Sequence, residues 1–289
     1  MNTTFLRALG WLAPTLLPLL IFVLYPALYS LYLAFHEVDS FSQRVVFTGW
    51  NNWSELFLSA AYWESVRSTF VFVLCTAVPS VALGLIIALL LYSRPFFQTL
   101  FRTLFLLPIA ISSAMAAMLW IFLFNPSAGY LNACLKMLHL PSPNWLGDPH
   151  WALGAVALAT VWEETGFQVV FLLAGLAQIP HELLEASSLD GANAWQRLRY
   201  VILPLLSPAL FFVSLVSCIS ALQNFGPIHI LTGGGPANAT NVLVYRLYRD
   251  AFQNFRTGIA SSQATILFIL ILGITWMQFR VGKSRVHYQ

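Results

Sequence analysis

Long apolar runs, separated by polar and turn-rich stretches, dominate the hydrophobic pattern of this chain. A helix needs about 20 mostly apolar residues to cross the hydrocarbon core of a bilayer. The runs are continuous and do not alternate as the strands of a membrane barrel do. The pattern therefore predicts an all-α integral membrane protein, a single transmembrane domain over residues 1–289 with six transmembrane helices. The predicted spans are residues 12–35, 69–92, 104–124, 151–176, 205–222 and 260–278.

The distribution of basic residues predicts the orientation of these spans. An even number of spans places both termini on one side, and that side carries eight Lys and Arg residues against six on the other. The six lie in longer loops, where the positive-inside rule has less weight. We therefore expect both termini to be cytoplasmic. The first run is too long for a signal peptide and lacks a small-residue cleavage site, so we expect a retained anchor.

Composition supports the membrane assignment and excludes several other classes of protein. Hydrophobic residues make up 58% of the chain and charged residues only 9%, against about 25% charged in soluble domains, so lipid must be the main solvent. The net charge of +3 comes without a Lys/Arg cluster, which argues against nucleic acid binding. Cys75, Cys134 and Cys218 are too few and scattered for a metal site or a disulfide framework. No G-x-S-x-G or H-E-x-x-H motif occurs, which argues against a membrane-embedded enzyme.

The polar segment between the fourth and fifth runs, residues 179–204, predicts two short helices joined by a tight turn. Pro180 suits the first turn of a helix, and Gly191 can adopt the positive φ needed at its end. Asn193 can cap a second helix, with Gln196 as its reciprocal partner in a capping box. We expect a compact helix-turn-helix that protrudes into the cytoplasm, with a loop helix lying on the bilayer as the alternative.

The spacing of residues within this segment resembles the EAA motif of permeases of binding-protein-dependent ABC importers. In that family Glu-Ala-Ala is followed by three residues, Gly, nine residues and Ile-x-Leu-Pro. Five of the seven defined positions are identical here, while Ser187 and Val201 keep a small and a β-branched residue. The resemblance implies that this segment docks on the partner ATPases, and Leu203-Pro204 predicts re-entry into the membrane. The implied coupling residues are Glu185, Ala186, Ser187, Asp190, Gly191, Leu203 and Pro204.

Further landmarks resemble carbohydrate-type permeases, in particular the subunit of maltose and glycerol-3-phosphate importers that pairs with a second, homologous permease. The resemblance implies the type I, MetI-like importer fold in a bacterial inner membrane. It also implies a permease heterodimer, two cytoplasmic ATPases that hold ATP and magnesium, and an extracytoplasmic solute-binding protein. This chain is expected to hold no cofactor or metal of its own. It is not expected to hydrolyse ATP, because Met277 stands where a P-loop ending in 282–284 requires Gly. The landmarks are residues 47–53, 107–108, 120–126, 174–176, 231–236 and 245–252.

Two adjacent carboxylates interrupt the fourth run and mark a candidate solute path. A charged side chain inside a bilayer costs about 2.5 to 3.5 kcal/mol on insertion scales, so Glu163 and Glu164 are expected to face a water-filled cavity. Thr160, Glu164 and Gln168 follow at i, i+4 and i+8 and form one polar stripe. The stripe is suited to bind the hydroxyl groups of a sugar or polyol; pairing with the partner permease or snorkelling is the alternative. Weaker candidates in other spans are Asn224 and Gln263.

The two carboxylates also bear on the class of solute. A phosphate ester would be repelled by an ionised Glu in a cavity of low dielectric constant, so a neutral saccharide or glycosylated polyol is favoured. Residues 120–126 and 286–289 nevertheless resemble the glycerol-3-phosphate permease, which keeps that solute as the alternative. A self-sufficient secondary transporter would also use intramembrane carboxylates. The segment 179–204 and the lack of a detectable inverted repeat argue against it.

Overall fold

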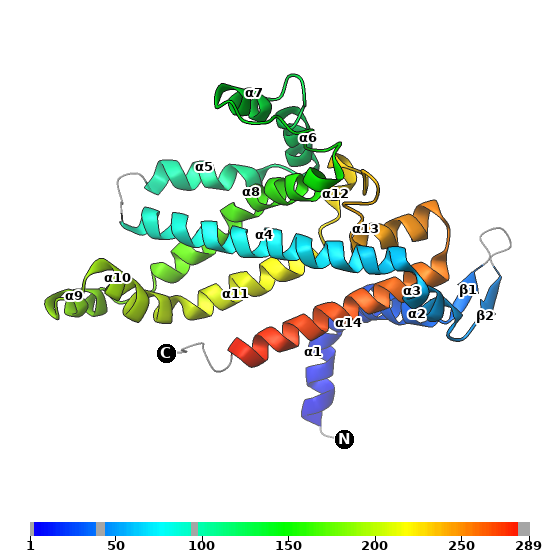
Figure 1. Cartoon of the computed structure of the whole chain (residues 1–289). Coiled ribbons are helices and arrows are strands. Elements are labelled where there is room, and N and C mark those ends of the chain that lie inside the picture. The colour runs from blue at the N-terminus through cyan, green and yellow to red at the C-terminus, as the bar shows by residue number, and fades with distance from the viewer. Residues whose placement is uncertain (1–2, 39–43, 94–97, 283–289) are drawn as a thin grey trace. The chain divides into compact units, whose positions relative to one another are not determined.

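The computed structural model describes residues 3–38, 44–93 and 98–282, which are mostly helical (Figure 1). The predictions that rest on Lys283 and on 286–289 lie outside the described residues. The elements of the first half are α1 (Thr3–Leu19), α2 (Tyr25–Leu33), β1 (His36–Val38), β2 (Val45–Phe47), α3 (Asn51–Leu58), α4 (Ala60–Ser93), α5 (Gln98–Ala110), α6 (Ser113–Leu123) and α7 (Tyr130–Met137). Those of the second half are α8 (Pro149–Leu176), α9 (His181–Leu189), α10 (Ala194–Arg197), α11 (Leu203–Leu222), α12 (Gly226–Leu231), α13 (Leu243–Tyr248) and α14 (Thr257–Gly282). Short π-helical segments occur at Leu20–Leu24, Leu198–Ile202 and Arg249–Gln253.

The all-α membrane fold is confirmed. Within the described ranges, five helical stretches are long and apolar enough to cross a membrane, and a bent pair of helices gives a sixth if it counts as one span. The sequence pattern did not predict the small antiparallel hairpin of β1 and β2, in which His36 pairs with Phe47. The five stretches are Trp11–Leu33, Ala60–Ser93, Pro149–Leu176, Ala194–Leu231 and Thr257–Gly282.

The third predicted span, residues 104–124, is bent rather than one straight helix. The apolar stretch breaks between α5 and α6, and Figure 1 shows the sharp bend between them, which measures 107°. Ser112 begins the second helix, because its hydroxyl oxygen accepts a hydrogen bond from the Met115 backbone N–H at 3.3 Å. An N-cap of this kind satisfies one of the free N–H groups at a helix start. The break between α5 and α6 is therefore stabilised by its own capping interaction.

Leu203-Pro204, where the chain is expected to re-enter the membrane, lies within one continuous helical stretch. The helix continues without a break from α10 through the π-helical segment Leu198–Ile202 into α11. The Leu203 N–H donates to the Leu198 carbonyl, five residues back, so the backbone turns more widely just before Pro204. Pro204 then occupies the first turn of α11, where proline is tolerated. The fifth helix is consequently much longer than residues 205–222.

The described residues form two compact units, and unit 1 is assembled from both halves of the chain. It consists of Met1–Trp63 and Arg246–Leu270. The Asn52 side-chain amide donates to the Ala34 and His36 carbonyls at 3.1 and 3.0 Å. The Ser262 hydroxyl donates to the same Ala34 carbonyl at 3.0 Å. Two polar side chains thus hold α2, α3 and α14 together.

Unit 2 consists of Glu64–Tyr245 and Ile271–Gln289, and α8 lies at its centre. Glycine allows the neighbouring helices to approach α8 closely: Gly166 faces the Phe105 carbonyl of α5, and Gly175 faces Ala209 of α11. Small residues at helix contacts are typical of membrane bundles, where packing replaces the hydrophobic effect. The buried core between α4, α8 and α11 consists of Ala88, Leu91, Val169, Leu172, Leu173, Leu176, Ile179, Leu206 and Val213.

Candidate functional site

A cavity of about 260 Å³ lies beside the break between α5 and α6. Its apolar wall includes Pro108, Ile109 and Ile111, which come from the end of α5 and the bend. Its polar wall comes from α8 and α11. The cavity therefore joins the bent span to the two helices that surround the predicted carboxylates. The polar lining residues are Glu163, Glu164, Gln168, Ser217 and Ser220.

Glu163 is held by the first turn of α6. The Ser113 hydroxyl donates to Glu163 Oε2 at 3.3 Å. Gly226, the first residue of α12, lies beside Ser113, because a Cβ added at Gly226 would be 3.3 Å from the Ser113 hydroxyl oxygen. Helix N-termini favour negative charge. Glu163 and Glu164 both line the cavity.

Gln168 links three helices at the cavity wall. Its side-chain amide donates to the Ser80 hydroxyl of α4 at 3.4 Å and to the Ser217 hydroxyl of α11. The side chain is 1% exposed. Among the described residues, neither Gln168 Oε1 nor the buried Glu164 Oε2 has a hydrogen-bond partner. Gln168, predicted as part of the polar stripe, thus also joins α8 to α4 and α11, and Gln168 Oε1 and Glu164 Oε2 remain as two acceptor atoms.

The other predicted path residues lie elsewhere. Thr160 is fully buried, and its hydroxyl donates to the Val156 carbonyl of its own helix at 3.0 Å. Asn224 follows the end of α11 and does not line the cavity. Gln263 belongs to unit 1, where its amide donates to Asp250 Oδ2 at 2.6 Å. Only Glu163, Glu164 and Gln168 of the predicted set therefore meet at one cavity.

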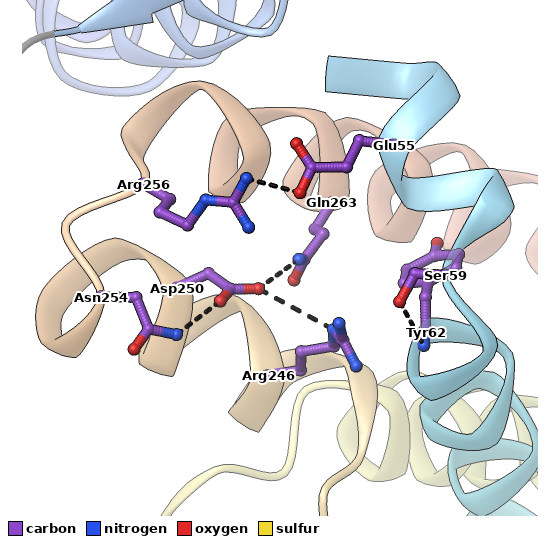
Figure 2. Close-up of polar contacts among 8 residues, drawn as sticks. All are labelled: Glu55, Ser59, Tyr62, Arg246, Asp250, Asn254, Arg256 and Gln263. Atoms are coloured by element: carbon purple, nitrogen blue, oxygen red, sulfur yellow. Dashed lines mark hydrogen bonds and ion pairs between the residues drawn. The ribbon is translucent and has the colours of Figure 1, made fainter. Parts of the chain in front are cut away.

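Figure 2 shows the polar cluster of unit 1 that contains Gln263. Asp250, in the π-helical segment before α14, accepts hydrogen bonds from Gln263 and, at 2.8 Å, from the Asn254 amide. Arg246 lies one helical turn earlier, with its Nε 3.8 Å from Asp250 Oδ2. The cluster satisfies a carboxylate that is only 8% exposed and fixes the turn that leads into α14.

The predicted helix-turn-helix is present in the form that the sequence indicated. Helix α9 ends at Leu189, and Gly191 adopts a φ of +77° in the turn that follows. Asn193 and Gln196 form both hydrogen bonds of the capping box, each at 2.9 Å. A further contact was not predicted: Arg197 Nη1 donates to the Ser188 hydroxyl at 3.0 Å and ties the two helices together.

The exposed surface of this helix-turn-helix, here called the α9–α10 knob (His181–Arg197), is unusually apolar at its tip. Leu189 is 90% exposed and Trp195 is 66% exposed. Glu185 and Ala186 are exposed as well, whereas Ser187 is buried and its hydroxyl donates to the Leu184 carbonyl at 2.7 Å. Ser187 therefore supports the knob from inside rather than facing a partner, because its position turns inward on α9.

Comparison with known proteins decides the family. Residues 80–284 match the family of binding-protein-dependent transport system inner membrane components. The chain belongs to this family. The sn-glycerol-3-phosphate transport system permease protein UgpA of Brucella abortus biovar 1 (strain 9-941) is 36% identical over 278 residues, which cover 96% of this chain and 94% of the relative. The protein of the same name from Agrobacterium fabrum (strain C58 / ATCC 33970) is 36% identical over 277 residues, with the same coverage.

Solved structures support the fold of this permease. It resembles a chain of a bacterial ABC transporter involved in the import of the acidic polysaccharide alginate, with a TM-score of 0.83, 23% identity and coverage of 95% of this chain and 94% of the other. The MetNI methionine ABC transporter gives a TM-score of 0.57 at 20% identity, covering 82% of this chain and 99% of the other. The MetI-like importer fold is thereby confirmed. The chain is a multi-pass inner-membrane transport subunit and not an enzyme.

Sequence reasoning missed four polar residues of the permease that now stand out. Ser217 and Ser220 are spaced i, i+3 on a mostly apolar helix, a signal that could have placed them on one face. Asp250 lies four residues after Arg246, which also marks a pair on one helix face. Ser113 had no comparable signal, because its partner Glu163 lies 50 residues away. Contacts of that kind depend on tertiary structure.

Proposed function

We propose that the cavity beside the α5–α6 bend is this permease's share of the solute path of its importer. The observation that carries the proposal is the set of carboxylate, amide and hydroxyl groups around a cavity inside a membrane-spanning helix bundle. Polar side chains at that depth are costly and usually face a pathway. Glu163, Glu164 and Gln168 are the proposed solute contacts, with Ser217 and Ser220 opposite them on α11.

The α9–α10 knob is the proposed contact with the ATPases. Its exposed Leu189 and Trp195 supply apolar area, and Glu185 supplies one carboxylate for a basic partner group. In this proposal two cytoplasmic ATPases bind ATP and magnesium, a second homologous permease completes the path, and both termini are cytoplasmic. An extracytoplasmic binding protein delivers the solute, in keeping with the family to which the chain belongs.

The proposed solute is a carbohydrate or a polyol glycoside. Polyhydroxylated solutes match a cavity that offers several hydrogen-bond acceptors. A second candidate is sn-glycerol-3-phosphate, because the relatives that are 36% identical carry that solute in their names. Membership of a binding-protein-dependent family leaves the ion-coupled secondary transporter without support.

Uptake measurements test the proposed path. The chain would be deleted from its host, and uptake of labelled neutral di- and oligosaccharides, glycosylglycerols and glycerol-3-phosphate would be measured before and after restoring it as wild type or Glu164→Gln. We expect the loss of one neutral solute, restored by the wild type and not by Glu164→Gln. Unchanged uptake of every solute after deletion would contradict the proposal.

Two substitutions in the knob test the coupling role. Glu185→Lys reverses the exposed charge, and Gly191→Pro cannot adopt the positive φ of the elbow. We expect either variant to insert in the membrane at normal abundance and to abolish uptake. Normal uptake in both variants would exclude the knob as the site of ATPase docking.

A further inference from the structure

The polar groups that the described residues place around the cavity are two carboxylates, one amide and two hydroxyls. The described lining residues include two carboxylates, Glu163 and Glu164, and no Lys, Arg or His. The Gln168 side-chain N–H groups donate to the Ser80 and Ser217 hydroxyls, and its side-chain carbonyl oxygen has no partner among the described residues. Buried polar atoms in native proteins are normally satisfied. Gln168 Oε1 and Glu164 Oε2 therefore require a donor that the described chain does not supply.

The position of the Glu163 carboxylate is fixed by the break in the third span. Ser113, the first residue of α6, donates to it from a helix start whose first N–H groups carry partial positive charge. Broken helices in transporters commonly direct such ends toward charged groups near the membrane midplane. The α6 N-terminus thus stabilises a negative charge that belongs to the protein itself. The α6 N-terminus therefore attracts an anionic group on the solute less strongly.

We infer that Glu163 and Glu164 determine the charge specificity of the permease: the cavity selects solute units that present hydrogen-bond donors and excludes anionic ones. This inference rests on the proposed solute path. Glu164 is the direct contact, because its Oε2 is buried and lacks a partner among the described residues. Glu163 contributes the second negative charge from the position that Ser113 fixes.

The size of the cavity limits what it selects. A volume of about 260 Å³ lies below the range of about 300 to 1,000 Å³ typical of ligand pockets, so this half of the path holds one small unit, such as a sugar ring or a glycerol. Neutral sugars, polyols and amino sugars have the required donors. A phosphate ester or a uronate places a negative charge near two carboxylates at reduced dielectric constant, where repulsion is strong. We therefore expect this chain to carry a solute other than sn-glycerol-3-phosphate.

Retention of labelled probes by the assembled importer tests the inference. The whole complex would be purified through a tag on this chain, placed in nanodiscs, trapped with vanadate without binding protein, and exposed to glucose, glucosamine or glycerol-3-phosphate. Wild type is expected to retain glucosamine at least as well as glucose, and both at least about tenfold better than glycerol-3-phosphate, a factor that corresponds to about 1.4 kcal/mol. Glu164→Gln and Glu163→Gln should each reduce that ratio several-fold. Glu64→Gln, which neutralises an exposed carboxylate on α4, is the matched control and should leave it unchanged.

The outcomes separate this inference from the proposed function. Retention of glycerol-3-phosphate as strong as that of glucose, or ratios unchanged in both cavity variants, would overturn the charge specificity while leaving the path in place. Weaker retention of glucosamine than of glucose would overturn it too. If wild type retains no probe and the cavity variants leave uptake unchanged, the path itself is refuted and the inference falls with it.

Discussion

Asp250 is the residue on which the polar cluster of unit 1 depends. The side chains of Asp250 and Arg246 are 11% and 18% exposed, and Asn254 and Gln263 bind the same carboxylate. Removing one partner of such a buried pair leaves the other charge buried without a counter-charge. We expect Asp250→Ala to lower the free energy of unfolding by about 3 kcal/mol, measured by denaturant titration of the purified protein in mixed micelles.

The second ion pair of the same unit gives the matched control. Arg256 and Glu55 also pair, but their side chains are 49% and 54% exposed (Figure 2). Exposed pairs contribute about 0 to 1 kcal/mol, so Glu55→Ala should change the free energy of unfolding by less than about 1 kcal/mol. Equal losses in Asp250→Ala and Glu55→Ala would show that the buried cluster has no special role.

Asp148, the N-cap of α8, gives a prediction about pH. The His150 backbone N–H donates to its carboxylate at 2.9 Å and lowers the pKa of Asp148 below its ordinary value of 3.8. A lowered pKa contributes stability that is present in full above the ordinary value and lost as the pH falls through the folded value. The stability advantage of wild type over Asp148→Asn should therefore be constant near neutral pH and shrink below pH 3.8. Melting curves of both proteins from pH 7 to pH 3 would measure it, and an advantage that grows on acidification would contradict this.

The residues that sequence analysis placed correctly are those with local signals. The capping box joins residues three apart, and Gly191 lies at the end of its own helix, so neighbouring residues were sufficient to predict both. Gln263 was predicted as a path residue, but its partner Asp250 belongs to the π-helical segment that precedes α14. Gln168 lies in the predicted stripe, yet its partner Ser217 is 49 residues away. Helical periodicity gives the face of a residue and not its neighbour.

At the scale of elements, the contact between α4 and α8 depends on the absence of a side chain. Gly84 lies on α4, and a Cβ added there would overlap the side chain of Gln168 on α8. A Cβ added at Gly154 of α8 would meet nothing within 4 Å. We expect Gly84→Ala to destabilise the protein by about 1 to 3 kcal/mol through overpacking. Gly154→Ala should be neutral or stabilising by up to about 1 kcal/mol, because alanine favours helix. Paired unfolding titrations would compare the two variants, and equal effects would contradict the close contact.

The errors in element boundaries have physical causes. The stretch 104–124 is apolar throughout, so hydropathy did not reveal the 107° bend. Pro108 and the pair Ser112-Ser113 were the available signals, because proline lacks an N–H and serine caps helices. Leu203-Pro204 gave the opposite error: a proline was interpreted as a boundary, but the π-helical turn before it let the helix continue.

At the scale of the whole molecule, the proposed coupling role requires the α9–α10 knob to transmit force as a rigid body. Within the described residues, the hydrogen bond from the Arg197 guanidinium to the Ser188 hydroxyl connects α10 to α9. We expect Arg197→Ala to lower the number of solute molecules transported per ATP hydrolysed by about twofold or more, since a charged hydrogen bond contributes about 1.5 kcal/mol or more. The neighbouring Arg199→Ala is the control, because Arg199 stacks on Tyr200 instead. Proteoliposomes that contain the full importer would give the rates of solute transport and of ATP hydrolysis. An unchanged ratio in Arg197→Ala would argue against a coupling role for the Arg197–Ser188 hydrogen bond.

The split origin of unit 1 has a consequence for biogenesis. Its first segment, Met1–Trp63, leaves the ribosome long before its second, Arg246–Leu270. At about 5 to 20 residues per second, the delay is on the order of 10 seconds or more. During that time the carbonyl of Ala34 can bind Asn52 but must wait for Ser262. The amino-terminal helices therefore lack the second segment of unit 1 through most of translation. This is the stage at which insertion machinery and proteases would compete for the chain.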